Sequence, residues 1–446
     1  MAAAHGNGRD VLVIGGGPAG IAAAVEAAEA GLSVTLCEQR PSLGGAIHRQ
    51  PAGGGESVRL PRSVRDQWRR LSGLLERRPI EMRTRHVFLG VDGDGLVLLD
   101  DRAKGRVTAE AFGAVIVAVG AVERVRPRPG WQLPGVVTAG GLQVMMKERG
   151  AAPSGRILLA GNGPLPIALA VQLASSGNAP VALVESGDPL GRFRAGLGLV
   201  AHPRLAIEAL GYLAALRASG VPWRRGSQLE SIERCGSALR ATLVARDGAR
   251  ETIETDMIAL HDGIGENAFG LPAEQAPGAG PVILRAGDCR EALGAIAAEA
   301  DGRRAARRVV AHLSGSPAPD ATHDRTIDRE RSAQKLLAGL FRPVGDLPAP
   351  SGETILCRCE GKTFGDLRRL LDRPDPVSPR EIKLVGRFGM GACQGRFCAR
   401  NILAHAGREG ADIGTLTGAR WPGRPVSIAS ILSSGDPDDA SETELR

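Results

Sequence analysis

The sequence predicts an α/β protein with two interleaved Rossmann-like dinucleotide-binding domains and a small, mainly helical domain after them. Glycine-rich loops follow short apolar strands at Gly15–Gly20 and Gly161–Pro166, a late apolar strand ends in Gly287-Asp288, and four cysteines gather near the C-terminus. The expected boundaries are 1–125 and 270–315 for the first domain, 126–269 for the second, 316–350 for a linker, and 351–446 for the last domain and tail.

Composition and charge exclude several classes of protein. The chain has 446 residues, of which 43% are hydrophobic and only 3% aromatic. The net charge of +7 is spread along the chain almost without interleaved aromatic residues, so nucleic acid is not an expected partner. No apolar run approaches the ~20 residues of a transmembrane helix, and the polar N-terminus does not resemble a signal peptide. Seven unevenly spread cysteines favour a reducing, cytoplasmic location with a metal site over a disulfide framework.

The first glycine-rich loop has the residues of a dinucleotide site in the right order. A buried strand is expected at residues 10–14, a helix runs to Ala30, and a second strand ends at Glu38, whose carboxylate can accept hydrogen bonds from a ribose. The glycines allow the tight turn, the approach of a pyrophosphate and close helix packing, while the helix N-terminus attracts the phosphates. The candidate residues of this half are Gly15, Gly17, Pro18, Ala19, Gly20, Glu38 and Gln39.

Features further along the chain favour FAD over NAD. The span 10–313 resembles the two-dinucleotide-binding-domain flavoprotein family, in which a late Asp binds the ribityl and phosphate region of the flavin. A helical pattern from about 292 to 313 follows that Asp here, and its N-terminus would face the pyrimidine ring. His48 and Arg49 are candidates for a flavin-side role, with simple packing as the alternative. The further FAD contacts that we expect are Gly45, Arg49, Ala118, Gly120, Gly287 and Asp288.

The second glycine-rich loop departs from the pattern, because Pro166 occupies its third glycine position. Proline changes the packing of helix on strand but is tolerated early in a helix. Two interpretations stay open: a working NADH site formed by Gly161, Gly163 and Glu185, or a domain kept for its architecture or for another nucleotide. Glu185 disfavours a 2′-phosphate, so NADH is favoured over NADPH. A helical insertion is expected at 188–221.

The four C-terminal cysteines form two close pairs. One pair is C-x-C and the other is C-x4-C, and the 33 residues between the pairs (360–392) are expected to be helical, with a capping-box-like start at Thr363 to Asp366. Zinc is the main alternative, but a C-x-C pair is unusual for zinc, whereas a [2Fe–2S] cluster accepts four such ligands. The sequence therefore predicts a [2Fe–2S] cluster bound by Cys357, Cys359, Cys393 and Cys398. The linker before them is expected to contain one short helix, at about 332–340.

The amino-acid sequence around the four cysteines resembles that of a known family of domains. Residues 357–360 and 387–398 are similar to the bacterioferritin-associated-ferredoxin-type [2Fe–2S] domain, in the version fused to FAD subunits of opine oxidases, hydroxyproline dehydrogenases and hydrogen cyanide synthase-like complexes. Residues 44–51 and 129–136 resemble the same subfamily, so the likeness spans about 10–432. It implies an alpha subunit that receives electrons from a separate FAD-containing beta subunit of the D-amino-acid-oxidase type. The further candidate partner is a small third subunit.

The resemblance does not name the substrate. Hydroxyproline, an opine, sarcosine or another secondary amine all fit a dehydrogenase or oxidase that acts on CH–NH donors. The alternative function is a self-sufficient NADH-dependent FAD/[2Fe–2S] reductase, in which the loop at Gly161 would bind NADH. A scaffold that holds both redox groups without turnover is a third, non-enzymatic hypothesis.

Overall fold

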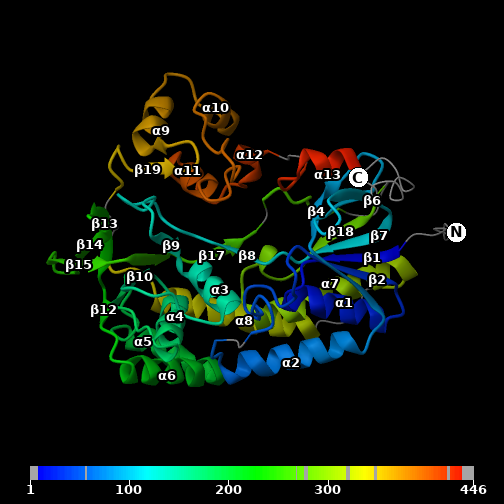
Figure 1. Cartoon of the computed structure of the whole chain (residues 1–446), viewed down its shortest axis with the longest axis horizontal. Helices are drawn as coiled ribbons and strands as arrows, with labels where there is room; N and C mark the ends of the chain where they lie inside the picture. Colours follow the sequence, from blue (N-terminus) through cyan, green and yellow to red (C-terminus); the bar gives the residue numbers. More distant parts are fainter. Residues whose placement is uncertain are drawn as a thin grey trace, which may run out of the picture.

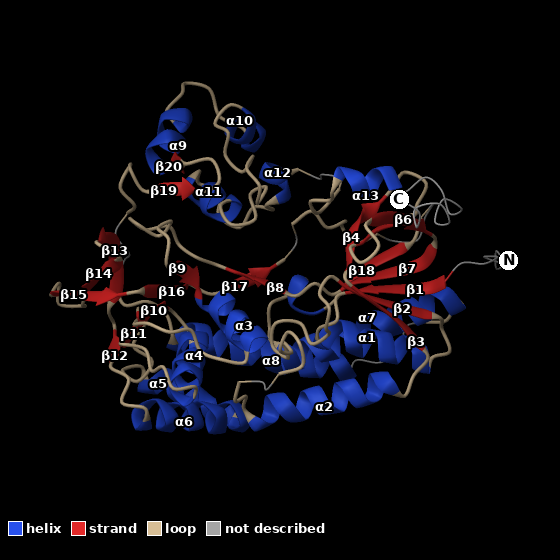
Figure 2. Ribbon diagram, in the orientation of Figure 1, coloured by secondary structure: helices blue, strands red, loops and turns tan. Residues whose placement is uncertain are grey.

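The computed structural model contains two α/β units side by side and a smaller, mainly helical unit that lies against both (Figure 1). It describes residues 9–55, 58–267, 269–275, 280–317, 322–345, 349–418 and 422–433. A five-stranded sheet forms the centre of each α/β unit, with the long helices gathered on one side (Figure 2). The predicted α/β fold is confirmed.

The first unit is built on a parallel sheet in the order β18-β7-β1-β2-β3. Alternate side chains of a strand face opposite sides of a sheet, so Val11 and Val13 pack against helices while Leu12 and Ile14 pack on the other face. The edge strand β18 follows the whole second unit in the chain. The strands are β1 (Arg9–Ile14), β2 (Val34–Glu38), β3 (Ile80–Thr84), β7 (Phe112–Val117) and β18 (Val282–Arg285).

Helices and a small antiparallel sheet cover the two faces of this first sheet. The helices are α1 (Pro18–Glu29), α2 (Arg62–Glu76) and α7 (Ala295–Ser314); the other face carries β4 (His86–Val91), β5 (Val97–Asp101) and β6 (Arg106–Glu110). Helices α1 and α7 approach closely, since a Cβ atom at Gly302 would lie 2.0 Å from the carbonyl oxygen of Ala19. This contact holds the helix of the first glycine-rich loop against the segment after β18.

The second unit repeats the pattern with a parallel sheet in the order β12-β11-β10-β16-β9. The five strands are β9 (Val136–Thr138), β10 (Ile157–Gly161), β11 (Ala182–Glu185), β12 (Trp223–Arg225) and β16 (Met257–His261). One face is covered by α3 (Ala139–Arg149), α4 (Pro164–Ser175) and α6 (Pro203–Ala218), and the other by the antiparallel strands β13 (Gln228–Cys235), β14 (Ala238–Val244) and β15 (Arg250–Thr255).

Short elements complete the second unit and join it to the first. The helical insertion expected at 188–221 is confirmed as α5 (Phe193–Gly196), the 3-10 helix η1 (Leu197–Ala201) and α6. Two crossover strands connect the units, β8 (Ala121–Glu123) and β17 (Ile264–Glu266), which pair antiparallel. The 3-10 turn η2 (Gly287–Cys289) follows β18, so α7 begins three residues later than the helical pattern indicated.

The predicted linker contains a long helix, α8 (Thr322–Leu340), of 19 residues. The expectation of one short helix at about 332–340 was therefore wrong. Arg331 pairs with Glu291 at 2.6 Å, and Ile327 packs in a small core beside α7. Leu340 and the next residue then enter the core of the second unit. The helix was underestimated because its first half is highly charged and its buried positions are few.

The C-terminal unit is mainly helical, as predicted, with a core around Leu356, Leu367 and Phe388. The capping box that begins α9 is confirmed: Thr363 Oγ1 accepts from the Asp366 N–H and the Asp366 carboxylate accepts from the Thr363 N–H. None of the helices in the described ranges is long and apolar enough to cross a membrane. The elements are β19 (Ile355–Cys357), β20 (Lys362–Thr363), α9 (Phe364–Leu371), α10 (Pro379–Leu384), α11 (Ala399–His405), α12 (Gly414–Thr417) and α13 (Ile428–Leu432), which returns to β6.

Candidate cofactor loops and cysteine cluster

The first glycine-rich loop leaves no room for side chains where it turns. Gly15 has φ +105°, and a Cβ atom there would lie 2.4 Å from the Ala118 carbonyl oxygen. A Cβ atom at Gly20 would lie 1.8 Å from the carbonyl oxygen of Gly15. The loop therefore needs glycine at both positions, which explains why strand, turn and helix can pack so closely.

Beside these contacts the loop is open where a phosphate would approach. Among the described residues, the only atom near a Cβ built at Gly17 is the Gly45 Cα, at 3.7 Å. Helix α1 begins there with Pro18 and Ala19, so its N-terminus faces the open side. The segment with Gly45 is held against the loop because the Gly44 N–H donates to the Gly16 carbonyl at 2.7 Å. The glycine-rich loop and the segment with Gly44 and Gly45, which are separated in the chain by α1 and β2, thus form one cradle.

Glu38 ends β2 and is buried beside the loop. Its Oε2 accepts from the Gly16 N–H at 2.9 Å, and its Oε1 accepts from the Arg40 N–H at 3.0 Å. Each carboxylate oxygen keeps a further lone pair for a ribose hydroxyl. The neighbouring Gln39 is exposed, so the edge of this site is uncovered on that side.

The late Gly-Asp pair lies against the same helix. Gly287 has φ +71°, and a Cβ atom there would lie 2.6 Å from the Ala19 Cβ. Asp288 Oδ1 accepts from the N–H groups of Leu293 and Gly294 at 3.0 and 2.9 Å, just before α7 begins. Burial raises the pKa of Asp288. These contacts fix the approach to α7. Gly120 (φ +75°) follows β7, the strand that pairs with β18.

His48 and Arg49 are both buried, with exposed fractions of 1% and 7%. His48 Nε2 lies 3.2 Å from Gln67 Oε1, and burial lowers the pKa of His48 to about 4. His48 Nδ1 and the Nε and Nη1 of Arg49 have no hydrogen-bond partner among the described residues, although Arg49 Nε lies 3.6 Å from Glu148 Oε1. Buried polar atoms are almost always satisfied, so these atoms await a partner that the described residues do not supply.

Lys147 is a further buried residue of this region, which sequence reasoning missed. Its Nζ donates to the carbonyl oxygens of Ala46 and Ile47 at 3.1 and 3.0 Å, and to Gln143 Oε1 at 3.2 Å. Burial lowers its pKa to about 8. From α3 of the second unit it holds the loop that carries His48 and Arg49. Its sequence position in the last turn of a helix resembles that of any solvated lysine, so no pattern could have indicated it.

Together these features fit FAD. The cradle at Gly17 has room for a pyrophosphate, and Glu38 lies where a ribose would be expected. The nitrogens of His48 and Arg49 that lack a partner among the described residues lie on the loop that closes the cradle.

The second glycine-rich loop is formed as well. Gly161 has φ +156° and lies against His261, and Gly163 has φ +100° with open space around it. Glu185 is fully buried and accepts from the N–H groups of Gly163 and Gly187 at 3.1 and 3.0 Å; burial raises its pKa to about 8. Pro166 is buried in α4 without breaking it. The loop has the Rossmann geometry.

The structure brings the two cysteine pairs together. The thiols of Cys357 and Cys398 are 3.7 Å apart, and both side chains are buried. Cys398 also hydrogen-bonds Cys393, which in turn contacts the more exposed Cys359. Donation from Cys398 lowers the pKa of Cys357 to about 6 and that of Cys393 to about 5. The pKa of Cys398 itself is raised, since it holds the proton between them.

This arrangement fits a metal centre better than a disulfide. Two thiolates on one tetrahedral ion at ~2.3 Å lie ~3.8 Å apart, close to the observed 3.7 Å, whereas a disulfide needs about 2.0 Å. In the described ranges no three or more His, Cys, Asp or Glu side chains are closed around a metal position. The full ligand set and the kind of metal therefore stay predictions.

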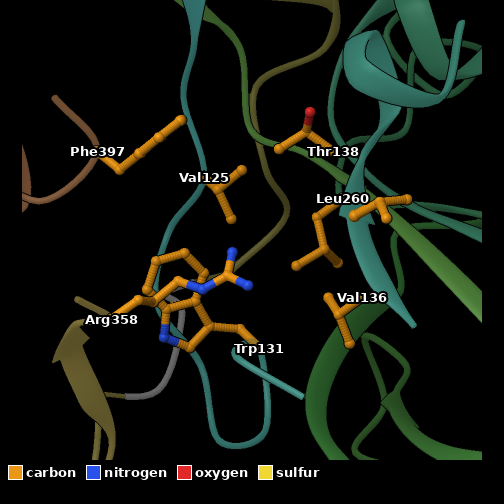
Figure 3. Close-up of a pocket in the computed structure, with 8 residues that line it drawn as sticks. Val125, Trp131, Val136, Thr138, Leu260, Arg358 and Phe397 are labelled. Atoms are coloured by element: carbon orange, nitrogen blue, oxygen red, sulfur yellow. The ribbon is translucent and has the colours of Figure 1, made fainter. Parts of the chain in front are cut away.

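The C-terminal unit is docked on two segments that join the α/β units: residues 124–135, between β8 and β9, and the strand β17. These two segments are called the crossover segments. Trp131 Nε1 donates to the Ile355 carbonyl at 2.7 Å, and the Arg358 guanidinium lies 5.1 Å from the centre of the Trp131 ring. Arg400 pairs with Glu266 of β17 at 2.7 Å. Figure 3 shows Arg358 over Trp131 at the edge of a pocket between the second α/β unit and the C-terminal unit. This pocket is lined by Val125, Trp131, Val136, Val137, Thr138, Leu260, Arg358 and Phe397.

Two dinucleotide folds joined by crossover strands define a flavoprotein oxidoreductase. The family model described as pyridine nucleotide-disulphide oxidoreductase matches residues 9–278. The chain therefore belongs to the pyridine nucleotide-disulphide oxidoreductase family.

Two curated relatives are similar over nearly the whole chain. An opine oxidase subunit of Rhizobium meliloti is 30% identical, over 96% of this chain and 99% of that protein. The hydrogen cyanide synthase subunit HcnB of Pseudomonas aeruginosa is 29% identical, over 95% of this chain and 98% of that protein. Among solved structures, L-proline dehydrogenase from P. horikoshii is similar with a TM-score of 0.62 at 17% identity, covering 95% of this chain and 79% of that chain. That last likeness shows the fold.

Proposed function

We propose that this chain is the electron-transfer (alpha) subunit of a heteromeric amine or imino-acid dehydrogenase or oxidase, and that it carries FAD and a [2Fe–2S] cluster. The substrate would be hydroxyproline, an opine or a sarcosine-like secondary amine. The partner would be a substrate-oxidising FAD subunit of the D-amino-acid-oxidase type, and a small third subunit is the further candidate. The observation that carries the proposal is the convergence of two distant cysteine pairs in a unit docked between two dinucleotide folds.

The cysteine geometry supports a redox cluster at a junction. Cys357 and Cys398 approach to 3.7 Å from segments on either side of α9 and α10. Arg358, beside Cys357, stacks on Trp131 of the crossover segment, so one ligand segment contacts the α/β units directly. When bound, FAD would supply two-electron chemistry and a [2Fe–2S] cluster one-electron chemistry.

The chain's own residues have separable roles in this proposal. Gly17, Glu38 and Arg49 would bind the pyrophosphate and ribose of FAD, and Lys147 holds the loop that carries Arg49. Neutral His48, whose pKa lies near 4, would present an uncharged ring. The names of the relatives support the partner and substrate class, since both are subunits, one of them of an opine oxidase.

The first test is the composition of the purified chain. We expect about one FAD and two irons per chain, equal acid-labile sulfide, and an EPR signal that appears after dithionite reduction. Zinc without iron would contradict the cluster. Hydroxyproline, sarcosine and opines should each leave the isolated chain oxidised, whereas the complex with its partner flavoprotein should bleach with one of them. Bleaching of the isolated chain by such a substrate would contradict the relay role.

A self-sufficient NADH reductase is the second candidate, because the loop at Gly161 and Gly163 has Rossmann geometry. It requires that NADH reach that loop in the intact chain. Direct reduction of the purified protein by NADH would favour it.

A further inference from the structure

The segment after α8 runs across the mouth of the second dinucleotide fold. Residues 341–344 leave the helix at Leu340 and pass beside the end of β11. In a Rossmann fold this edge, just beyond the acidic residue that ends the second strand, receives the adenosine ribose of a dinucleotide. That acidic residue is Glu185 here.

Main-chain hydrogen bonds hold the segment in place like a short added strand. The Val344 N–H donates to the Ser186 carbonyl oxygen at 2.9 Å, and Pro343 forms an antiparallel bridge with Gly187. A Cβ atom at Gly187 would lie 2.7 Å from the Phe341 carbonyl oxygen, so the two backbones are in contact. The glycine thus makes room for the segment where other side chains would push it away.

Side chains of the site itself fasten the segment further. Asn162, in the middle of the second glycine-rich loop, donates from Nδ2 to the Phe341 carbonyl and to Ser186 Oγ. Gln228 Nε2 donates to the Val344 carbonyl at 3.0 Å, and Arg192 Nη2 donates to the Pro343 carbonyl at 3.5 Å. Arg192 Nη1 also donates to the carbonyl of Gly339, in the last turn of α8, at 2.7 Å. Pro343 consequently lines the same pocket as Gly161 and Asn162. The Asn162 side chain of this loop is thus engaged in holding the chain's own backbone, whereas the space at Gly163 stays open among the described residues.

The first unit provides an internal comparison. Glu38 and Glu185 end equivalent strands, and each accepts an N–H from its own glycine-rich loop. The residue after Glu38 is the exposed Gln39, whereas Ser186, after Glu185, is buried. The two halves share a fold but differ in whether this edge is open.

We infer that residues 341–344 exclude dinucleotides from the second fold and thereby determine which electron donor the protein accepts. NADH can dock at the Gly161 loop only when the segment withdraws from Ser186 and Gly187. The block is local, since the segment touches the ribose edge and not the FAD cradle. The exclusion of dinucleotides does not rest on the proposed function, whereas its consequence for the electron donor does.

The sharpest test is a proline at position 344. Val344→Pro removes the N–H that bonds Ser186, while Val344→Ala keeps it and serves as the matched control. In the FAD-loaded full chain we expect roughly a five- to tenfold fall in the Kd for NADH with Val344→Pro, the effect of one lost hydrogen bond, and little change with Val344→Ala. Calorimetry under anaerobic conditions measures both, and FAD content shows that each variant has folded.

A second variant removes the segment's contacts as a whole. Replacement of residues 341–344 by Gly-Ser-Gly-Ser should give saturable NADH binding, with protection from hydrogen exchange at 182–190 appearing only when NADH is added. Micromolar NADH binding by the wild type would overturn the inference. Failure of both variants to gain binding while retaining FAD would overturn it equally, because the segment would then not be what closes the site.

Discussion

At the scale of residues, the first glycine-rich loop contains glycines of two kinds. Some leave no space for a side chain, whereas others would accept one, and the difference marks the candidate cofactor site. In the first loop Gly15 and Gly20 are enclosed by backbone atoms, whereas Gly17 faces open space. The enclosed pair shapes the turn, and the open position would admit the pyrophosphate of the proposed FAD. Substitutions at these positions should therefore act through different physical causes.

Gly20→Ala should release FAD. The new Cβ would lie 1.8 Å from the Gly15 carbonyl oxygen, so the loop must move away from its helix. We expect FAD retention after gel filtration to fall about tenfold or more, in line with the cost of overpacking. Gly73→Ala is the control, since Gly73 is also helical but has no described atom within 4 Å of its Cβ position, and it should keep FAD. Equal FAD content in both variants would refute the role of Gly20.

We expect Lys147 to make the stability of the protein depend on pH. Burial lowers its pKa from 10.5 to about 8, so between these values the unfolded chain binds more protons than the folded chain. The stability linked to this group is thus complete above pH 10.5 and is lost as the pH falls through 8. The stability of wild type relative to Lys147→Met should rise by about 2–3 kcal/mol between about pH 8 and pH 10.

Denaturant unfolding across that pH range measures the difference. Lys335→Met, at an exposed position of α8, controls for the general effect of removing a lysine charge. If the difference in free energy of unfolding between wild type and Lys147→Met stays constant from pH 8 to pH 10, Lys147 is not a buried cation.

At the scale of elements, sequence patterns predicted the structures that contacts between neighbouring residues stabilise. The glycine-rich loops, their strands and the Thr363 capping box follow from neighbouring residues, and all are present. The first half of α8 was missed because its charged side chains pair across the surface, as Arg331 does with Glu291. Residues 341–344 bind largely through main-chain groups, which leave no trace in an amino-acid pattern. The burial of Lys147 depends on a loop that lies about 100 residues earlier in the chain.

The cysteine element gives a prediction of its own. Cys398→Ser removes the thiol that contacts both Cys357 and Cys393, so iron should fall to near zero while FAD is retained. Cys235→Ser, in the hairpin of β13 and β14, is the control and should keep both. Metal analysis and the visible spectrum measure the outcome. A Cys398→Ser protein with wild-type iron content would exclude Cys398 as a ligand.

At the scale of the whole molecule, few contacts decide whether the C-terminal unit stays docked. Trp131→Phe removes the N–H donor to Ile355, so hydrogen exchange at residues 355–357 should accelerate roughly fivefold, the effect of one hydrogen bond. Trp223→Phe is a matched control, because its buried Nε1 has no hydrogen-bond partner among the described residues. Equal exchange at 355–357 in both variants would mean that the Trp131 bond does not hold the units together.

The ion pair between Arg400 and Glu266 should matter less. Both side chains are more than a third exposed, and exposed pairs contribute little. The Trp131 contacts, which also place Arg358 beside the cysteine cluster, should contribute more than this ion pair. Other contacts share in the docking, such as the donation from Asn401 to the Val125 carbonyl at 3.2 Å.

The most direct test of the proposed relay function is an anaerobic absorption titration of the purified chain with NADH, followed by dithionite. We expect the flavin and iron–sulfur bands to stay oxidised with NADH and to bleach with dithionite. Residues 341–344 cover the second nucleotide edge, and in the proposed function the electrons would come from a partner flavoprotein. Stoichiometric bleaching by NADH would contradict this account and identify the chain as a reductase in its own right.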